Sequence, residues 1–315
     1  MLNFNQLRIF YHVAKNLSHT LAAKDLFITQ PAVTAQIKCF EDYCNIKLLK
    51  RRGREIYLTD EGGILYKYAQ KIFEYEKEFD RVIEDLRKLK KGFLRLGTTK
   101  TYARYFMPFL VTNFHEIYPC IQIQLNEGSS QEMIESLLHH KNEIALIAKA
   151  SDHPDICFIP FSKEEVVLIV SPEHRFAKRK SISVQDLSNE PIIMKETGSG
   201  TRKLINGLFE KYQCTPNIVM EIGNTEFIKQ LVHRGEGISF LVRESILHEL
   251  SENKLIIIPI KTEPIFLDVS IAYIKNQPLS PAGQAFLKII DKLAQDGLPL
   301  KGIGSLVFKK TDLKA

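Results

Sequence analysis

The hydrophobic pattern of this chain changes its period at Gly92, and this change limits the folds that are open to it. Before Gly92, apolar residues recur at intervals of three and four, which is typical of amphipathic helices. From Phe93 onward, short apolar runs alternate with helical segments, which is typical of an α/β unit. The chain has 315 residues, whereas a single domain commonly has ~150. We therefore expect at least two folded units, divided near Gly92.

The segment before residue 30 predicts two helices. Apolar residues from Phe4 to Leu17 fall on one helical face, and Ser18 can end or cap this helix. A second, short helix fits Thr20 to Leu26, where two alanines are small enough for another helix to approach closely. A turn at residues 27–29 then leads into a third helix.

The third helix is the candidate DNA-reading element. Thr29 can cap it, and Pro31 is tolerated in its first turn because the missing N–H has no partner within the helix. Val33, Ile37 and Phe40 would be buried at i, i+4 and i+7, which leaves one polar face exposed. The positions that we expect to contact DNA are Gln30, Pro31, Thr34 and Lys38, with Ala35 between them. The three helices together predict a helix-turn-helix.

Basic residues are concentrated near the N-terminus. Residues 1–59 contain nine Lys or Arg and four Asp or Glu, so they carry most of the formal net charge of +6. The apolar alternation around Gly53 predicts a two-stranded wing tipped by Arg52 and Gly53. We expect Arg51, Arg52 and Arg54 to contact DNA phosphates or the adjacent minor groove. A three-helix core that binds nothing is the alternative, but it does not require a basic hairpin.

Residues 60–91 predict a long helix that pairs two chains. Leu65, Ile72, Phe79 and Leu86 recur every seven residues, and Tyr68, Tyr75, Val82 and Leu89 fill the d positions of the same heptads. A helix packed only on its own domain is the alternative. The basic residues from Arg87 to Lys91 suit a last turn before Gly92. A two-fold dimer predicts a roughly palindromic site on double-stranded DNA.

The segment after Gly92 predicts an α/β ligand-binding unit. The expected strands are Phe93 to Gly97, Ile121 to Leu125, Ile144 to Ala148, Val166 to Val170, Ile192 to Met194, Ile218 to Ile222, Ile238 to Val242 and Phe266 to Tyr273. The expected helices are Tyr102 to Ile117, Ser130 to His140, Thr201 to Tyr212 and Thr225 to Arg234. This alternation predicts largely parallel sheets with ligands at the carboxyl ends of the strands.

Two strand-to-helix corners are rich in hydroxyl groups and indicate a small anionic ligand. The first is residues 98–101 and the second is residues 196–202. Each combines hydrogen-bond donors, a helix N-terminus and a nearby cation. The expected effector-binding residues are Thr99, Lys100, Thr101, Thr197, Ser199, Thr201 and Arg202. Plain helix caps are the alternative at each corner, and residues 128–130 form a third corner that is read as a cap alone.

Other function classes find little support in the sequence. Five cysteines without a C-x-x-C pair suit a reducing compartment and argue against structural zinc. No apolar run approaches the ~20 residues of a membrane span, and the first ten residues lack a signal-peptide pattern. We therefore expect a cytoplasmic protein that has no cofactor and is not an enzyme. The alternatives are a cytoplasmic solute-binding or transport accessory protein, and an α/β enzyme with a DNA-binding head.

Several motifs resemble the LysR-type transcriptional regulators. They are Ala22-Ala23-x-x-Leu26, Thr29-Gln30-Pro31-Ala32-Val33-Thr34, Leu49-x-Arg51-x-x-Arg54 and Leu58-Thr59-x-x-Gly62. The resemblance implies a winged helix-turn-helix, a dimerising linker helix and a periplasmic-binding-protein-like (type 2) α/β domain. It also implies a coinducer cleft between two subdomains joined by paired crossovers, a tetramer built from dimers, and RNA polymerase as a possible partner.

The resemblance also divides the chain and points to effectors. It implies a DNA-binding domain at 1–59, a linker helix at 60–91, an effector domain at 92–297 and a tail at 298–315. Subdomain I would comprise 92–161 and 267–297, and subdomain II 162–266. The first corner looks like that of sulfur-assimilation regulators, whose threonines bind sulfate or a related metabolite, which points to Thr99 and Thr101. The second corner is more similar to that of carbon-fixation regulators.

Overall fold

The computed structural model describes residues 1–53, 55–149 and 152–295. The chain divides into two compact units, residues 1–85 and residues 86–315. Each unit is described by itself, and we call them the head and the effector unit. Among the described residues, no helix is both long and apolar enough to cross a membrane.

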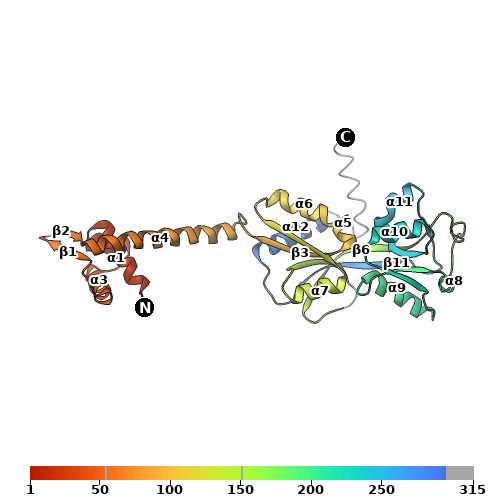
Figure 1. Ribbon diagram of the computed structural model, residues 1–315, viewed down its shortest axis with the longest axis horizontal. Helices are drawn as coiled ribbons and strands as arrows, with labels where there is room; N and C mark the ends of the chain where they lie inside the picture. The colour runs from red at the N-terminus through yellow and green to blue at the C-terminus, as the bar shows by residue number, and fades with distance from the viewer. Residues whose placement is uncertain (54, 150–151, 296–315) are drawn as a thin grey trace. The chain divides into compact units, whose positions relative to one another are not determined.

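The head is a winged helix-turn-helix (Figure 1). Its elements are α1 (Phe4–Asn16), α2 (His19–Asp25), α3 (Gln30–Cys44), β1 (Leu49–Arg52), β2 (Glu55–Leu58) and α4 (Asp60–Arg87). Side chains cap the three short helices as their sequences require. Ser18 accepts a hydrogen bond from Leu21 N at the start of α2, and Thr29 accepts one from Ala32 N at the start of α3. The wing strands pair antiparallel from Leu49 with Leu58 to Arg52 with Glu55.

The apolar face of α3 forms part of the head core. Val33, Ile37 and Phe40 are 0%, 5% and 2% exposed, so the predicted inward face is confirmed. Thr34 and Lys38 are exposed on the other side of the same helix. The core of the head therefore fixes which face of α3 meets a partner.

The structure corrects the predicted seam on α4. Leu65 and Ile72 pack against the core of the head, so they do not belong to an exposed seam. The helix ends at Arg87, and Leu89 has a left-handed φ of 57° and packs against the core of the effector unit. The exposed large apolar residues of α4 are Ile64, Tyr68, Tyr75, Phe79 and Leu86. The seven-residue spacing predicted an amphipathic helix, as observed. It also placed in one seam both the residues that pack against the head and those that are exposed.

The effector unit is built on one mixed sheet and a smaller parallel pair. Its strands are β3 (Phe93–Thr99), β4 (Gln122–Gly128), β5 (Ile144–Ala148), β6 (Ile156–Val170), β7 (Ile192–Lys195), β8 (Ile218–Ile222), β9 (Ser239–Val242), β10 (Ile256–Ile258) and β11 (Ile265–Ile274). The main sheet has the order β10-β6-β11-β5-β3-β4, with β9 paired to β6, and β7 pairs with β8.

The helices of this unit pack on its sheets, and helices and strands together form two lobes. They are α5 (Lys100–Tyr105), α6 (Met107–Ile117), α7 (Ser130–Leu138), α8 (Val184–Leu187), α9 (Gly200–Lys211), α10 (Thr225–His233), the 3₁₀ turn η1 (Arg243–Ile246), α11 (Leu247–Ser251) and α12 (Pro281–Gln295). We call the half with β3–β5, α5–α7 and α12 lobe I, and the half with β7–β10 and α8–α11 lobe II (Figure 1).

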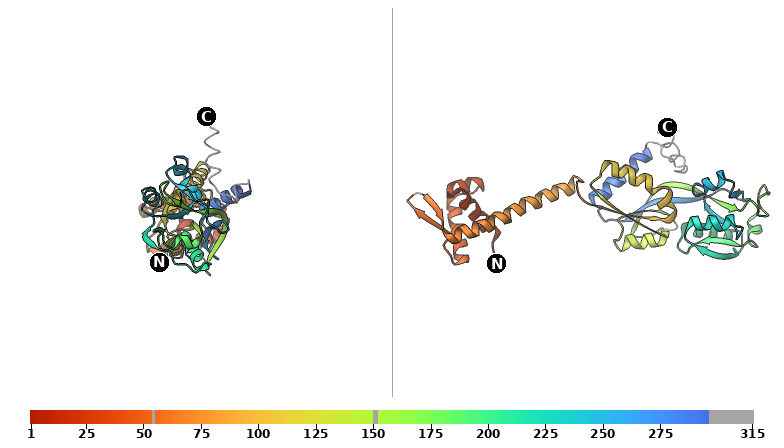
Figure 2. Two further views of the ribbon diagram at one scale, coloured as in Figure 1. Left: turned by 90° about the vertical axis from the view of Figure 1, so that its right-hand side faces the viewer. Right: turned by 45° about the horizontal axis from the view of Figure 1, so that its top comes forward.

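Two long strands connect the lobes and correct the expectation of largely parallel sheets. β6 and β11 pair antiparallel from Val166 with Ile265 to Ile156 with Ile274, and they pass through both lobes (Figures 1 and 2). β11 is also antiparallel to β5, whereas β3 is parallel to both β4 and β5. The lobes are therefore joined by a paired crossover.

The predicted helix from Tyr102 to Ile117 is two helices, α5 and α6, with a break at Phe106. Pro108 explains the break, because proline has no N–H and its ring clashes with the carbonyl of the residue four positions earlier. The short α5 carries the first hydroxyl-rich corner at its start.

Candidate DNA-binding surface and effector cleft

The exposed face of α3 carries a hydrogen-bonded pair. Gln30 Nε2 donates to Thr34 Oγ1 over 3.0 Å, and Thr34 Oγ1 donates to the Gln30 carbonyl over 3.1 Å. Pro31 and Lys38 are exposed beside them. The predicted contact residues of this helix therefore lie on one surface, as a helix lying in a major groove requires.

The sequence analysis missed His19, which supports this surface from α2. Its Nδ1 lies 3.0 Å from Thr34 Oγ1. Burial lowers the pKa of His19, and the nearby charge of Arg51 lowers it further, so the ring is neutral at neutral pH. Single-sequence periodicity gives no signal for this contact, because it joins two helices across a turn.

The wing exposes its basic side chains to solvent, and Glu41 holds the backbone at the start of the wing. Arg51 and Arg52 are exposed, while Arg54 lies outside the described residues. Glu41 is 7% exposed, and its carboxylate accepts hydrogen bonds from the Leu48 and Leu49 backbone N–H groups and from Lys47 Nζ, over 2.8, 3.1 and 2.7 Å.

Burial would raise the pKa of Glu41, but these donors outweigh burial and lower it. A charged Glu41 therefore ties the wing to α3. Sequence reasoning counted Glu41 only as an acid, since nothing in its spacing marks a residue that closes a loop.

The lobes of the effector unit enclose a small cleft of about 30 Å³. Its polar lining is Thr99, Lys100, Thr101, Tyr102, Ser129, Ser130, Lys195, Glu196, Ser199 and Thr201. Five of the predicted effector residues are in this set, from α5 and from the start of α9. Hydroxyl groups, two ammonium groups and a helix N-terminus form a lining that suits an anion.

Three contacts close the cleft across the lobes. Lys100 Nζ lies 3.1 Å from Glu196 Oε2, and Thr101 Oγ1 lies 3.0 Å from Thr225 Oγ1. A backbone hydrogen bond also joins Gln131 N to the Gly198 carbonyl over 3.3 Å. These contacts place the first corner of lobe I directly against lobe II.

Lys195 is a buried cation of the cleft that the sequence analysis did not name. Its Nζ donates to the Gly223 carbonyl over 2.6 Å and to Thr225 Oγ1 over 3.2 Å. Burial lowers its pKa to about 8; Glu196 opposes this shift and Lys100 adds to it. An apolar strand ending in lysine was the available signal, but the prediction ended the strand at Met194.

Two buried hydroxyl groups of the cleft lack hydrogen-bond partners within the part of the chain that the structure describes. They are Ser130 Oγ and Tyr102 OH, on residues that are 1% and 2% exposed. Ser130 was read as part of a cap, and Ser129 does cap α7. Unsatisfied buried polar groups are costly, so Ser130 Oγ stands out among the groups that line the cleft.

Thr197 and Arg202 do not line this cleft but an adjoining cavity of about 690 Å³, which shares Ser130 and Ser199 with it. Both contact Glu221: Thr197 donates from its backbone N and its Oγ1 over 2.8 and 2.7 Å, and Arg202 forms an ion pair. The Arg202 guanidinium and then the Thr197 donors lower the pKa of Glu221 to about 2. These contacts hold the second corner in place.

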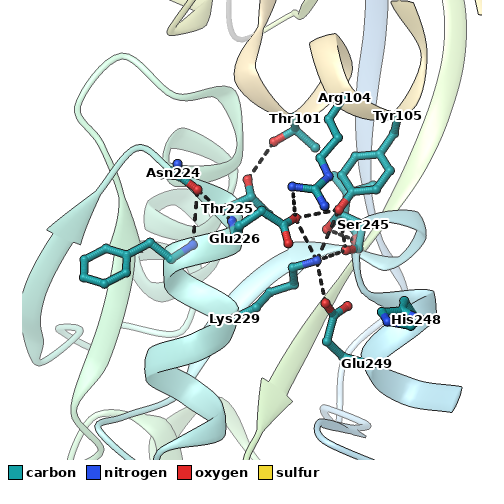
Figure 3. Close-up of polar contacts among 12 residues, drawn as sticks. Thr101, Arg104, Tyr105, Asn224, Thr225, Glu226, Lys229, Ser245, His248 and Glu249 are labelled. Atoms are coloured by element: carbon teal, nitrogen blue, oxygen red, sulfur yellow. Dashed lines mark hydrogen bonds and ion pairs between the residues drawn. The ribbon is translucent and has the colours of Figure 1, made fainter. Parts of the chain in front are cut away.

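A polar cluster behind the cleft joins α5 to lobe II (Figure 3). Tyr105 OH donates to Glu226 Oε1 over 2.7 Å and lies 3.0 Å from the Ser245 carbonyl oxygen. Lys229, 4% exposed, contacts Glu226 and Glu249 over 2.8 Å each. Burial would lower the pKa of Lys229, but the hydrogen bonds to these acids raise it. The start of α5 therefore faces the cleft while its end is fixed to lobe II.

A winged helix-turn-helix and a two-lobed unit around a polar cleft define the class: a DNA-binding transcriptional regulator that senses a small molecule. Residues 4–63 match the family model described as "Bacterial regulatory helix-turn-helix protein, lysR family". Residues 87–295 match the family model described as "LysR substrate binding domain". The chain belongs to the LysR family of transcriptional regulators. This assignment favours the regulator over a solute-binding accessory protein.

Individual relatives agree with the family. The chain is 36% identical to the HTH-type transcriptional activator CmpR of Synechocystis sp., over 90% of this chain and 93% of that protein. It is 32% identical to a probable RuBisCO transcriptional regulator of Thalassiosira pseudonana, over 89% and 93%. A solved structure of the Synechocystis CcmR regulatory domain with 2-PG matches with a TM-score of 0.60 and 28% identity, over 64% of this chain and 97% of that one.

Proposed function

We propose that this regulator senses a small anionic metabolite in the cleft between its lobes and has no catalytic role. The observation that carries the proposal is the lining of the cleft, where hydroxyl groups surround Lys100 and Lys195. The similar CcmR regulatory domain with 2-PG supports an anion of the phosphorylated carboxylate type. The ligand would favour one arrangement of the lobes and so shift the arrangement of the heads, by at most its difference in affinity for the two states.

The proposed effector contacts follow from the geometry of the cleft. Thr99, Lys100, Thr101, Ser199 and Thr201 remain in the set, and Tyr102, Ser130 and Lys195 join it. Thr197 and Arg202, which contact Glu221, stay in the proposal through the adjoining cavity that they line.

A charged ligand should stabilise the effector unit. At ~100 times its dissociation constant, a ligand adds about 2.7 kcal/mol to the free energy of unfolding. We expect 2-phosphoglycolate to raise the melting temperature of the full chain. Thr99→Val should reduce that shift by removing a cleft hydroxyl, and Thr112→Val, exposed on α6, should leave it unchanged. Stabilisation by uncharged compounds but by no anion would contradict the proposal.

The proposed DNA contacts are Gln30, Pro31, Thr34, Lys38, Arg51, Arg52 and Arg54, which lies outside the described residues. We propose that two heads bind a roughly palindromic promoter site through a dimer formed by α4, whose exposed residues Tyr68, Tyr75, Phe79 and Leu86 offer an apolar surface. A tetramer of such dimers, a contact with RNA polymerase, and the domain limits at 59, 91 and 297 belong to the same proposal.

Two substitutions in the head should affect DNA binding differently. Arg51→Ala should weaken binding to specific and scrambled duplexes alike and reduce the salt slope by about one unit per lost phosphate contact. Gln30→Ala should instead reduce the discrimination between the two duplexes by about 1 to 3 kcal/mol. Fluorescence anisotropy at several salt concentrations measures both effects, with exposed Lys211→Ala in α9 as the charge control. Unchanged discrimination by Gln30→Ala would assign base reading to other residues.

A further inference from the structure

The effector cleft contains an anion of its own, the Glu196 carboxylate of lobe II. It lies 3.1 Å from the ammonium group of Lys100 in lobe I. Glu196 is the acid among the described residues that line the cleft. The nearby Glu132 is instead engaged with the backbone N of Ser129 at the start of α7. Lys100 is therefore neutralised by a residue of the opposite lobe.

The backbone of Gly223 gives this carboxylate a defined position. A Cβ atom at residue 223 would lie 1.7 Å from Glu196 Oε2 and 2.7 Å from Lys100 Nζ. Any side chain there would push the ion pair apart, so the absence of a side chain is what lets the carboxylate lie between Gly223 and Lys100. The neighbouring carbonyl of Gly223 accepts the hydrogen bond from Lys195, so one loop organises all three charges.

The enclosed part of the cleft beside this ion pair is too small for a metabolite. Its volume of about 30 Å³ is close to that of one or two water molecules, which is far less than a phosphate or carboxylate ester needs. Cavities of about 690 and 380 Å³ adjoin it, the first lined in part by Ser130 and Ser199 and the second by Lys100 and Thr101. A ligand can therefore reach Lys100 from an adjoining cavity, or enter the enclosed part if a side chain moves. Because Lys100 is the cation at the first corner, an anionic ligand that reaches it meets Glu196 as a competitor.

We propose that Glu196 is a specificity-determining residue, an internal competitor whose carboxylate an anionic effector must displace from Lys100. This inference rests on the proposed anion-sensing function. A monoanion that replaces Glu196 only exchanges one negative charge for another at Lys100. A phosphate dianion adds a second negative charge between Lys100 and Lys195, where the buried ammonium group of Lys195 attracts it more strongly than an exposed cation would. Glu196 therefore sets a threshold that favours effectors of higher charge.

The test compares the binding of inorganic phosphate to the full chain and to matched variants by calorimetry. Glu196→Gln keeps the shape of the side chain and removes its charge. We expect this variant to bind phosphate roughly tenfold more tightly, because phosphate no longer has to displace a carboxylate from Lys100. Glu236→Gln makes the same change in net charge at an exposed position and should bind phosphate as the unchanged chain does. Lys100→Gln should weaken binding, and the gain from Glu196→Gln should disappear in the Lys100→Gln background.

Each result decides the proposal. Equal or weaker phosphate binding by Glu196→Gln would show that Glu196 helps to hold the ligand, and it would overturn the competitor role. A gain that persists without Lys100, or that Glu236→Gln reproduces, would overturn the assigned mechanism. If no variant bound phosphate but an uncharged compound stabilised the chain, the proposed anion-sensing function itself would fail. Unchanged melting temperatures of the unliganded variants would verify that all of them fold.

Discussion

Gly62→Ala should strongly destabilise the head, although alanine is the better helix former and Gly62 lies in the first turn of α4. A Cβ atom at residue 62 would lie 2.1 Å from the Leu48 carbonyl oxygen. That oxygen cannot move away easily, because it accepts a hydrogen bond from Thr59 N over 3.0 Å while Leu48 N donates to Glu41. We expect a loss of about 3 kcal/mol or more in the free energy of unfolding, the upper range for overpacking.

Gly63→Ala provides the matched control. No heavy atom lies within 4 Å of a Cβ at residue 63, so this change should stabilise α4 by about 0.5 to 1 kcal/mol through helix propensity alone. Hydrogen exchange of the α1 and α3 amides in the full chain measures both changes. Equal protection in the two variants would mean that the contact between α4 and the start of the wing does not constrain the head.

The effector unit should lose stability as the pH rises from 5 to 8, because of Glu164. This residue is 0% exposed in β6, receives a 2.6 Å hydrogen bond from Ser162 Oγ, and faces the carboxyl group of Glu244. Burial and the nearby Glu244 carboxyl raise the pKa of Glu164 to about 7. The hydrogen bond from Ser162 acts in the opposite direction but is the smaller effect. The folded chain therefore holds a proton that the unfolded chain releases near its ordinary pKa of 4.5.

The sign of the effect follows from this difference. Because the folded state binds the proton more tightly, the contribution of Glu164 to stability is complete below pH 4.5 and is lost as the pH rises through about 7. The loss is on the order of 3 kcal/mol. Glu164→Gln should remove most of this pH dependence and be more stable than the unchanged chain at pH 8.

Thermal unfolding at a series of pH values measures this prediction. Glu116→Gln, an exposed change on α6, should retain the pH profile of the unchanged chain. If Glu164→Gln lost stability equally at pH 5 and pH 8, the carboxyl would be ionised throughout. The raised pKa would then be wrong.

The head was the part of the structure most open to prediction. The caps Ser18 and Thr29 and the inward face with Val33, Ile37 and Phe40 follow from local spacing. A helix needs partners only three and four residues away, so a short stretch of sequence contains the information that it uses. For the same reason the polar face of α3 was predicted residue by residue.

The lining of the cleft was predictable only in part. The first corner and Ser199 and Thr201 were found because hydroxyl groups cluster where a strand meets a helix. Lys195 and Tyr102 were missed, since a lysine ending a buried strand and a tyrosine in a short helix carry no local mark of a cleft. Thr197 and Arg202 line the adjoining cavity instead, and both contact Glu221 of the neighbouring strand.

The sequence by itself determined most of the helices and strands, where the charges gather, and to which family the chain belongs. Only the tertiary structure decided the direction of β6 and β11, the inward packing of Leu65 and Ile72, and the meeting of Lys100 with Glu196. The physical reason is how far apart in the chain the interacting residues lie. Periodicity and capping act between near neighbours in the chain. Strand pairing and ion pairs join residues far apart in the chain, such as Ile156 with Ile274 and Lys100 with Glu196, and a single sequence does not identify those partners.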